Sequence, residues 1–391
     1  MIGRTSIAVK AFGNAPKIRL LFWGDGMVQS IGAPGQPLPV GGRVATERLR
    51  PIPFDDLTAS DLASWTAVLQ GERFSSPFLA PEFCKAANQV SGNVFVASLG
   101  SRDDAVFFPF QRRGYLPTIA DKVGGHMSDW CGIVGSGKNR FGEREILAAT
   151  GLSVFCFDHW PQAECPISSE RVVETQGTKV VVENPQTYFA DLRAKDRKFV
   201  NEVERLERQL TESFGKVRFE WHSTRSEMEL ERLIVEKRKQ YEQSKVADAL
   251  SSSWSQNLLR ALLATRSKDF DAVMSTIYCG DNWLASHFGL RFGNVLHVWF
   301  PVYNADFRRF GPGHMILFKI IAHGLSIGIR EFDFGVGLAS YKKKYGGVVY
   351  SVAKGNLKAR DLTSFAHSAA QSIKWRIQRQ VAISNRHKSE A

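Results

Sequence analysis

The sequence predicts a mixed α/β fold, and three observations carry this prediction. Three strand-like runs follow one another at 272–279, 283–290 and 295–302, with only short turn sequences between them. A glycine-containing turn comes next, followed by an apolar stretch with helical spacing over 315–327. A further strand-like run lies at 331–335. This order indicates a mostly antiparallel sheet flanked by helices.

Composition sets the broad class of protein. The chain has 391 residues, 43% hydrophobic and 11% aromatic, so it can bury two or three cores and is not disordered as a whole. Its apolar runs are too short for a membrane span, and its beginning lacks the pattern of a secretion signal. The five cysteines are scattered without metal-binding spacing. We therefore expect a soluble cytoplasmic protein with reduced cysteines and no metal.

The charge balance favours anionic partners. The formal net charge of +12 suits coenzyme A, nucleic acid or a peripheral contact with a membrane surface. It does not choose among these, and a basic soluble protein without such a partner has the same composition.

Four segments divide the chain. Residues 1–50 carry Gly, Pro and Arg without periodicity and are predicted to be a flexible extension. Residues 51–190 alternate helix-like and strand-like runs, which predicts a small α/β domain. Residues 191–360 contain the strands described above, and 361–391 are predicted to form a basic amphipathic helix with a frayed tip.

Hydrophobic spacing and turn residues predict the individual elements. We expect a helix over 61–69, capped by Ser60 or Asp61, and a second helix with Pro81 in its first turn. The other expected elements are strands at 94–99 and 105–111 joined by a polar turn at 101–104, a helix at 144–151, a strand at 154–158, helices at 195–210 and 229–241, and a last strand at 348–352. Basic residues on the helices at 195–210 and 229–241, such as Lys195 and Lys237, suit a polyanion, but a solvated helix face is the commoner explanation.

The turn Arg308-Arg309-Phe310-Gly311-Pro312-Gly313 fits the pattern Arg-x-x-Gly-x-Gly. Backbone N–H groups at the start of the following helix form an anion site at the positive end of its dipole, suited to a diphosphate. Pro312 has no N–H, so the cradle would rest on Gly311, Gly313 and the residues after them. A tight strand-to-helix connection without any ligand explains the same six residues.

The loop Gly124-Gly125-His126-Met127-Ser128-Asp129-Trp130 brings His, Asp and Trp together. These residue types do acid–base or ligand-binding work, which makes Asp129 and Trp130 candidates for substrate binding. A structured glycine-rich turn explains the loop at least as well.

Taken together, these segments resemble the GNAT acetyltransferases, in particular the CelD/BcsL type named for a link to bacterial cellulose biosynthesis, which is similar to the FemABX peptidyltransferases. The C-terminal motifs that carry the resemblance are Ala285-Ser286-His287-Phe288-Gly289-Leu290, Pro312-Gly313, Phe332-Asp333-Phe334-Gly335 and Tyr341-Lys342. The N-terminal ones are Ser76-Pro77-Phe78, Pro81-Glu82-Phe83 and Ser128-Asp129-Trp130. The resemblance covers residues from about 54 to 355 and implies two GNAT-like domains in tandem. We expect the first to have no donor site of its own, because its sequence lacks an Arg-x-x-Gly-x-Gly turn before a helix.

The resemblance implies transfer of an acyl group from acetyl-CoA, or another acyl-CoA, to an amine or hydroxyl. Such enzymes position the two reactants and polarise the thioester carbonyl. The CoA diphosphate would lie on Gly311, Gly313 and His314, with Arg308 as counter-charge.

An amine acceptor must lose a proton, so a base is expected near the strand ends. Asp333 is the first candidate, and His287 or His297 the next. Tyr341 would protonate the departing thiolate, as a tyrosine near this position does in many GNAT enzymes, and Lys342 would bind an anionic group. Each has a structural alternative: Asp333 a cap or brace, the histidines core positions, Tyr341 ring packing and Lys342 solvation.

Two other functions stay open. A FemABX-like transferase would use aminoacyl-tRNA, which the basic helices would suit, although the sequence holds no RNA-binding motif. A non-catalytic partner of polysaccharide machinery is the other. The sequence does not name the acceptor, so sugar amine, peptide and protein lysine all remain open.

Overall fold

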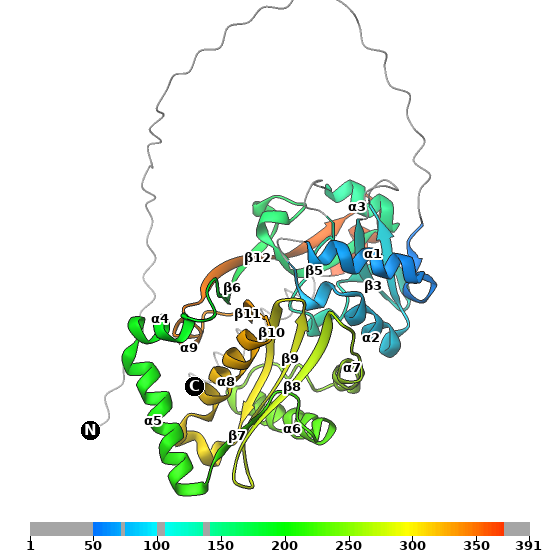
Figure 1. Ribbon diagram of the computed structural model, residues 1–391. Helices are drawn as coiled ribbons and strands as arrows, with labels where there is room; N and C mark the ends of the chain where they lie inside the picture. The colour runs from blue at the N-terminus through cyan, green and yellow to red at the C-terminus, as the bar shows by residue number, and fades with distance from the viewer. Residues whose placement is uncertain (1–49, 72–74, 100–105, 136–140, 371–391) are drawn as a thin grey trace, which may run out of the picture. The chain divides into compact units, whose positions relative to one another are not determined.

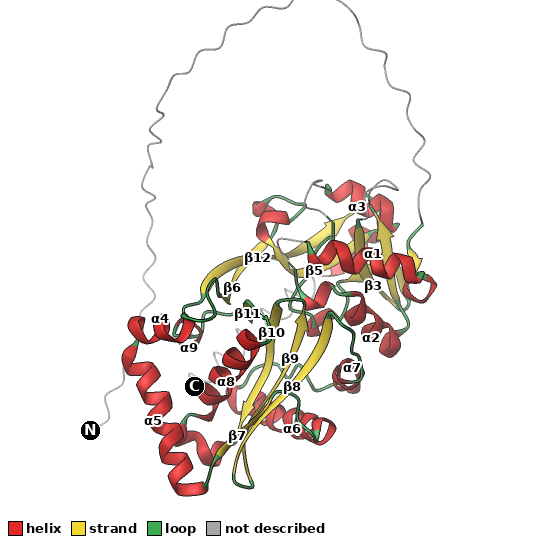
Figure 2. Cartoon of the chain, in the orientation of Figure 1, coloured by secondary structure: helices red, strands yellow, loops and turns green. Residues whose placement is uncertain are grey.

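The described chain folds around one twelve-stranded sheet with helices packed against it (Figures 1 and 2). The computed structural model describes residues 50–71, 75–99, 106–135 and 141–370. Apart from residue 50, the predicted N-terminal extension lies outside these ranges, as do the predicted turn at 101–104 and the end of the predicted C-terminal helix. That helix begins at Leu362. None of the helices within the described ranges is long and apolar enough to cross a membrane.

The sheet is mostly antiparallel, as predicted. The parallel neighbours are β4 with β5 and β10 with β11. In spatial order the strands are β1 (Ile52–Pro53), β2 (Val94–Ser98), β3 (Phe107–Arg113), β4 (Leu116–Asp121), β5 (Val154–Pro161), β12 (Val348–Lys358), β6 (Val173–Val181), β11 (Glu331–Val336), β10 (Val295–Tyr303), β9 (Asn282–Phe292), β8 (Phe270–Cys279) and β7 (Val217–Glu220).

Helices lie between these strands along the chain. They are α1 (Ala59–Gln70), α2 (Pro81–Ser91), α3 (Glu143–Thr150), α4 (Tyr188–Lys195), α5 (Arg197–Phe214), α6 (Ser226–Ser244), α7 (Ser253–Leu263), α8 (Pro312–Ser326) and α9 (Ser340–Lys343). A 3-10 helix (Ala305–Phe310) connects β10 to α8.

The predicted three-stranded meander is confirmed as β8, β9 and β10. The predicted helix that follows it is α8, and the run at 331–335 is β11. These elements were predictable because neighbouring strands are joined by short turns and every signal is local.

Two cores cover opposite faces of the β8–β10 region. Phe288, Leu290 and Phe292 of β9 pack with α6 and α7 in one core. Ala285 of β9 packs with α8 and α5 in the other. The alternation of side chains along β9 therefore separates an α6 face of the sheet from an α8 face.

The last strand differs most from the sequence prediction. β12 extends to Lys358 instead of ending near Val352, and it inserts between β5 and β6. A C-terminal strand thus joins strands that come before residue 190. The division into segments at 50, 190 and 360 stays a prediction.

The N-cap of α1 differs from the predicted one. Thr58, and not Ser60 or Asp61, is the N-cap: its Oγ1 accepts from the Asp61 N–H at 3.2 Å, and the Asp61 carboxylate accepts from the Thr58 N–H at 2.9 Å. This reciprocal capping box needs an extended residue three positions before the acid, which only Thr58 supplies.

Candidate active site

The parallel strands β10 and β11 stop pairing at one pair of candidate residues. They pair over only three residues each, and the last pair is His297 with Asp333. Directly after His297 a bulge interrupts the pairing of β10 with β9, and after Asp333 an irregularity interrupts the pairing of β11 with β6. Bulges beside the end of a ladder re-aim side chains and are frequent at active sites. β10 and β11 lie side by side next to α8 (Figure 1).

His297 lies between two carboxylates at this point. Its Nε2 is 3.0 Å from Oδ2 of Asp129, and its Nδ1 is 3.1 Å from Oδ2 of Asp333. The other oxygen of Asp333 accepts from the Gly335 N–H and from the Tyr350 hydroxyl, both at 2.8 Å. The structure therefore brings together three residues that are far apart in the sequence. Asp129 precedes His297 by 168 residues, and Asp333 follows it by 36. We call these three residues the acid–histidine cluster.

Only one member of the acid–histidine cluster reaches solvent. The side chains of His297 and Asp333 are 1% and 6% exposed, whereas that of Asp129 is 27% exposed. An incoming molecule would therefore meet Asp129 first, with His297 behind it.

The two carboxylates hold His297 in its charged form. Burial alone would lower the pKa of His297, but Asp333 and Asp129 outweigh burial and raise that pKa to about 9. Burial likewise works to raise the pKa of each carboxyl, and the His297 charge overcomes it, so both carboxyl pKa values lie below their ordinary range. At neutral pH the cluster is an imidazolium between two carboxylates.

Lys342 supplies a second positive charge close by. It is 5% exposed, and its Nζ donates to the carbonyl oxygens of Gly335 and Val336, both at 3.0 Å. Burial lowers the pKa of Lys342, while Asp333 and Asp129 work to raise it. The predicted alternative of a solvated Lys342 is wrong, because the amine is turned inward onto the end of β11.

Gly335 is a glycine for a structural reason. Its φ is 69°, a left-handed conformation, and a Cβ there would lie 3.3 Å from Oδ2 of Asp129 and 3.4 Å from Cε1 of His297. The backbone of β11 thus approaches the acid–histidine cluster as closely as it can only because this residue has no side chain.

The loop that carries Asp129 is held by a buried lysine. Lys122 is 4% exposed, donates to the Ser128 carbonyl and pairs with Asp158. Next to Asp129, the ring of Trp130 packs edge-on against Tyr350 with ring centroids 5.5 Å apart. Trp130 Nε1 is buried and has no hydrogen-bond partner among the described residues. Asp129 and Trp130, two of the three predicted substrate-binding residues, therefore lie at the cluster.

His287 lies on the other face of the sheet. It is fully buried, neighbours Ser275 and Pro301 across the strands, and burial lowers its pKa to about 3. Within the described part of the chain, neither ring nitrogen has a hydrogen-bond partner. The geometry does not bring His287 into the acid–histidine cluster, and no residue of the cluster hydrogen-bonds to it.

The predicted anion turn precedes α8. Gly311 is the N-cap with φ of 63°, which glycine adopts without strain. Its N–H donates to the Arg308 carbonyl at 3.1 Å, and its carbonyl accepts from the His314 N–H at 3.0 Å. Two of the N–H groups expected to cradle a diphosphate are thus used inside the turn, and an anion would meet the Gly313 N–H first.

Around this turn lie aromatic residues that form a small cluster of their own. Nδ1 of His314 is 2.7 Å from the hydroxyl of buried Tyr345. The ring of Tyr341 lies 6.4 Å from that of His314, and burial raises the pKa of Tyr341. Lys344 is close enough to His314 to lower its pKa together with burial, the larger cause. Arg308 is exposed. The predicted donor residues therefore gather at the start of α8, beside Tyr341.

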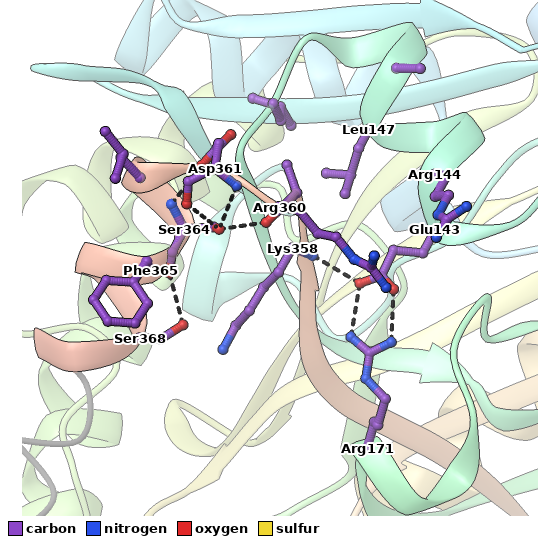
Figure 3. A pocket seen from close by; sticks show the side chains of 14 residues that line it. Glu143, Arg144, Leu147, Arg171, Lys358, Arg360, Asp361, Ser364, Phe365 and Ser368 are labelled. Atoms are coloured by element: carbon purple, nitrogen blue, oxygen red, sulfur yellow. Dashed lines mark hydrogen bonds and ion pairs between the residues drawn. The ribbon is translucent and has the colours of Figure 1, made fainter.

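A hollow lies elsewhere in the described protein. It has a volume of about 1180 Å³ and is lined by residues of α3, the end of β12 and the helix that begins at Leu362. Figure 3 shows Arg171 joined to Glu143 by two hydrogen bonds, at 2.7 and 2.9 Å, on the opposite side of the hollow from Phe365. None of the predicted site residues lines it.

Comparisons with known proteins identify the class of the C-terminal part. Residues 197–343 match the family described as acetyltransferase (GNAT) domain, so this span contains a GNAT-type domain. It includes the end of β10–β11 pairing, the turn before α8 and Tyr341. The predicted mixed α/β fold class with GNAT-like architecture is confirmed. No curated protein sequence matches the chain.

Two solved structures show the fold over most of the chain, and a third is similar at a lower TM-score. The crystal structure of FemX is 10% identical and has a TM-score of 0.51, with 75% of this chain and 95% of that chain covered. A conserved protein of unknown function from Bacteroides thetaiotaomicron is 13% identical, with a TM-score of 0.50 and coverage of 78% and 99%. A tandem GNAT protein from the clavulanic acid biosynthesis pathway is 10% identical, with a TM-score of 0.39 and coverage of 80% and 98%.

Sequence reasoning missed two residues of the site. Tyr350 and Lys122 were not singled out, although they hold Asp333 and the Asp129 loop. Tyr350 is on β12, whose placement next to β6 has no local signal. Lys122 follows β4, a strand that the alternation of side chains did not reveal. Only the burial of Lys122 in the fold identifies this residue as part of the site.

Proposed function

We propose that this protein is an acyl-CoA-dependent acyltransferase, in the first instance an N-acetyltransferase, that acts on an amine or hydroxyl acceptor. One observation carries the proposal: within the span that matches a GNAT domain, β10 and β11 stop pairing at His297 and Asp333, and the helix that follows begins at a glycine turn. Backbone groups of β10 left without a strand partner can pair with the amides of a pantetheine arm, as an added strand would.

The donor lies along β10 with its diphosphate at the start of α8. The Gly313 N–H and the helix dipole favour the anion, and the exposed Arg308 and neighbouring Lys344 add positive charge. Tyr341 lies beside this turn and protonates the thiolate that leaves.

The acceptor meets the acid–histidine cluster from the α6 face. Its nitrogen attacks the thioester carbon, so a C–N bond forms as the C–S bond breaks. Asp129 contacts the acceptor, and His297, in the fraction of molecules in which its imidazole is neutral, takes up the amine proton through Asp129. Asp333, behind His297 and already holding two hydrogen bonds, positions the imidazole.

This assignment changes the role given to Asp333. The sequence favoured Asp333 as the base, but only 6% of its side chain is exposed and its oxygens face Gly335, Tyr350 and His297. We therefore assign proton uptake to His297 and Asp129, which lie between Asp333 and the incoming acceptor.

Donor binding is the first test. Acetyl-CoA should raise the melting temperature of the wild-type protein, and Gly313→Asp should abolish that rise because the carboxylate repels the diphosphate. Gly313→Ala is the matched control: the nearest atom to an added Cβ is 3.7 Å away, and the position is helical, so binding should persist. Equal responses in both variants would place the diphosphate elsewhere.

The aminoacyl-tRNA alternative draws on the resemblance to FemABX and on the basic helices α5 and α6. Several of these basic side chains are already paired with carboxylates: Arg205 with Glu202 and Arg238 with Asp248, both at 2.8 Å. Because pairing reduces the charge available to a phosphate backbone, we rank CoA above aminoacyl-tRNA as the proposed donor. Titration with tRNA at physiological salt separates the two donors.

The place of this reaction in polysaccharide or cell-envelope biosynthesis, the CelD/BcsL type and a cytoplasmic location stay predictions. The first two rest on the motifs quoted from the sequence, and the location rests on the short apolar runs and the scattered cysteines. A non-catalytic role in such machinery predicts CoA binding without turnover on any acceptor.

A further inference from the structure

Lys237 occupies a position where the pattern of α6 calls for an apolar residue. The buried face of this helix runs through Leu230, Leu233 and Ile234, and the same stripe continues at Lys237 and Tyr241. Lys237 is half-buried. A charged residue in the inward stripe of a helix is costly unless something compensates the charge.

The amine of Lys237 reaches β10 just beyond the bulge. Its Nζ donates to the Pro301 carbonyl at 3.2 Å, four residues after His297 in the strand. It also lies 5.5 Å from the centre of the Tyr241 ring. Tyr241 in turn lies within electrostatic reach of Asp129, because burial and then the charges of Asp129 and Asp248 raise the pKa of Tyr241 to about 12. Lys237 is therefore on the α6 face, on the side of the sheet to which the acid–histidine cluster points.

Four other lysines among the described residues that turn inward have a carboxylate near the amine. Lys122 pairs with Asp158, Lys179 with Glu331 at 2.9 Å and Lys319 with Glu207 at 2.6 Å. Lys342 has Asp333 and Asp129 close by.

Lys237 has no such partner. No carboxylate within the described ranges forms an ion pair with it, and burial lowers its pKa to about 8. A carbonyl oxygen and a ring face satisfy only part of an ammonium with three donors. The helix thus holds a cation whose counter-charge is missing from the described protein.

We infer that the acceptor substrate carries an anionic oxygen group, carboxylate or phosphate, and that Lys237 binds this group while the acceptor amine meets Asp129. This rests on the proposed acyl transfer. An acceptor with a positive and a negative end would find Asp129 for one and Lys237 for the other, so both charges would be compensated once the acceptor is bound.

A matched set of small amines tests the inference. With acetyl-CoA as donor, the KM values of β-alanine, 6-aminohexanoate, 2-aminoethyl phosphate and ethanolamine are compared in wild type and Lys237→Met. The wild type should prefer the anionic amines to ethanolamine, and Lys237→Met should raise their KM by about tenfold or more. The KM of ethanolamine and of acetyl-CoA should not change. Lys237→Arg should restore part of the loss, and Lys239→Met, on the same helix but paired with Glu236, should have no effect.

A preference for the phosphate or for the carboxylates identifies which anion is bound. Equal KM changes for charged and uncharged amines in Lys237→Met would overturn the inference and leave the acyltransferase proposal intact. Failure of the wild type to bind acetyl-CoA would instead overturn the proposed function and this inference with it.

Stability gives an independent readout. Because Lys237→Met replaces an uncompensated charge by an apolar side chain in the inward stripe, it should keep or raise the melting temperature. A clear drop, in a variant that also treats all acceptors alike, would mean that Lys237 is structural.

Discussion

Asp333→Asn tests how the acid–histidine cluster is held together. It removes one of the two negative charges beside a buried imidazolium and keeps the size of the side chain. Since His297 titrates at about 9 instead of 6.5, at about 1.4 kcal/mol per pKa unit its partners stabilise the folded protein by on the order of 3 kcal/mol. Breaking a buried pair by removing one partner costs about 3–5 kcal/mol.

The pH dependence has a definite sign. The folded-state pKa of His297 is above its ordinary value, so its contribution is complete below pH 6.5 and is lost as the pH rises through about 9. Urea unfolding of the wild type should therefore show stability falling across this window. In Asp333→Asn the fall should be smaller, because the pKa of His297 drops by about 1–3 units when one adjacent opposite charge is removed.

NMR titration of the His297 ring and the pH–rate profile report the same change. If Asp333 positions His297, the alkaline rise of kcat/KM should move to lower pH in Asp333→Asn. If Asp333 is itself the base, turnover should fall by ~10²–10⁴ with no such shift. Asp121→Asn, which removes a carboxylate paired with Arg113 away from the cluster, is the control. An unchanged His297 titration in Asp333→Asn would refute the reasoning.

Two more substitutions examine the neighbouring positions. Gly335→Ala adds left-handed strain and a Cβ 3.3 Å from Asp129, whereas Gly346→Ala adds strain alone, since no atom lies within 4 Å of the added Cβ. The melting temperature and turnover should therefore both fall further in Gly335→Ala than in Gly346→Ala. Equal losses in the two variants would show that crowding at Asp129 does not matter. Tyr341→Phe keeps the ring and removes the hydroxyl, so kcat should fall by roughly 10²-fold with the KM of acetyl-CoA unchanged; a wild-type kcat in stopped assays of thiol release would exclude Tyr341 as the acid.

Local signals explain what the sequence could predict. The meander β8–β10, the turn at Gly311 and helix α8 each depend on residues close together in the chain. His297, Asp333, Asp129 and Trp130 could be proposed from residue type and motif.

Their roles depended on long-range contacts that have no local signal. Nothing near Asp333 indicates that Tyr350 will occupy one of its oxygens, because that contact needs β12 to insert between β5 and β6. Likewise, the difference in burial between half-buried Asp129 and enclosed Asp333 emerges only when two distant segments meet. Lys237 was visible as part of a basic run, but its inward position was not.

Titration calorimetry of the full-length wild-type chain with acetyl-CoA tests the central claim most directly. The account predicts saturable binding at one site per chain, at the turn before α8. The absence of binding in folded protein, or two equivalent sites per chain, would contradict it.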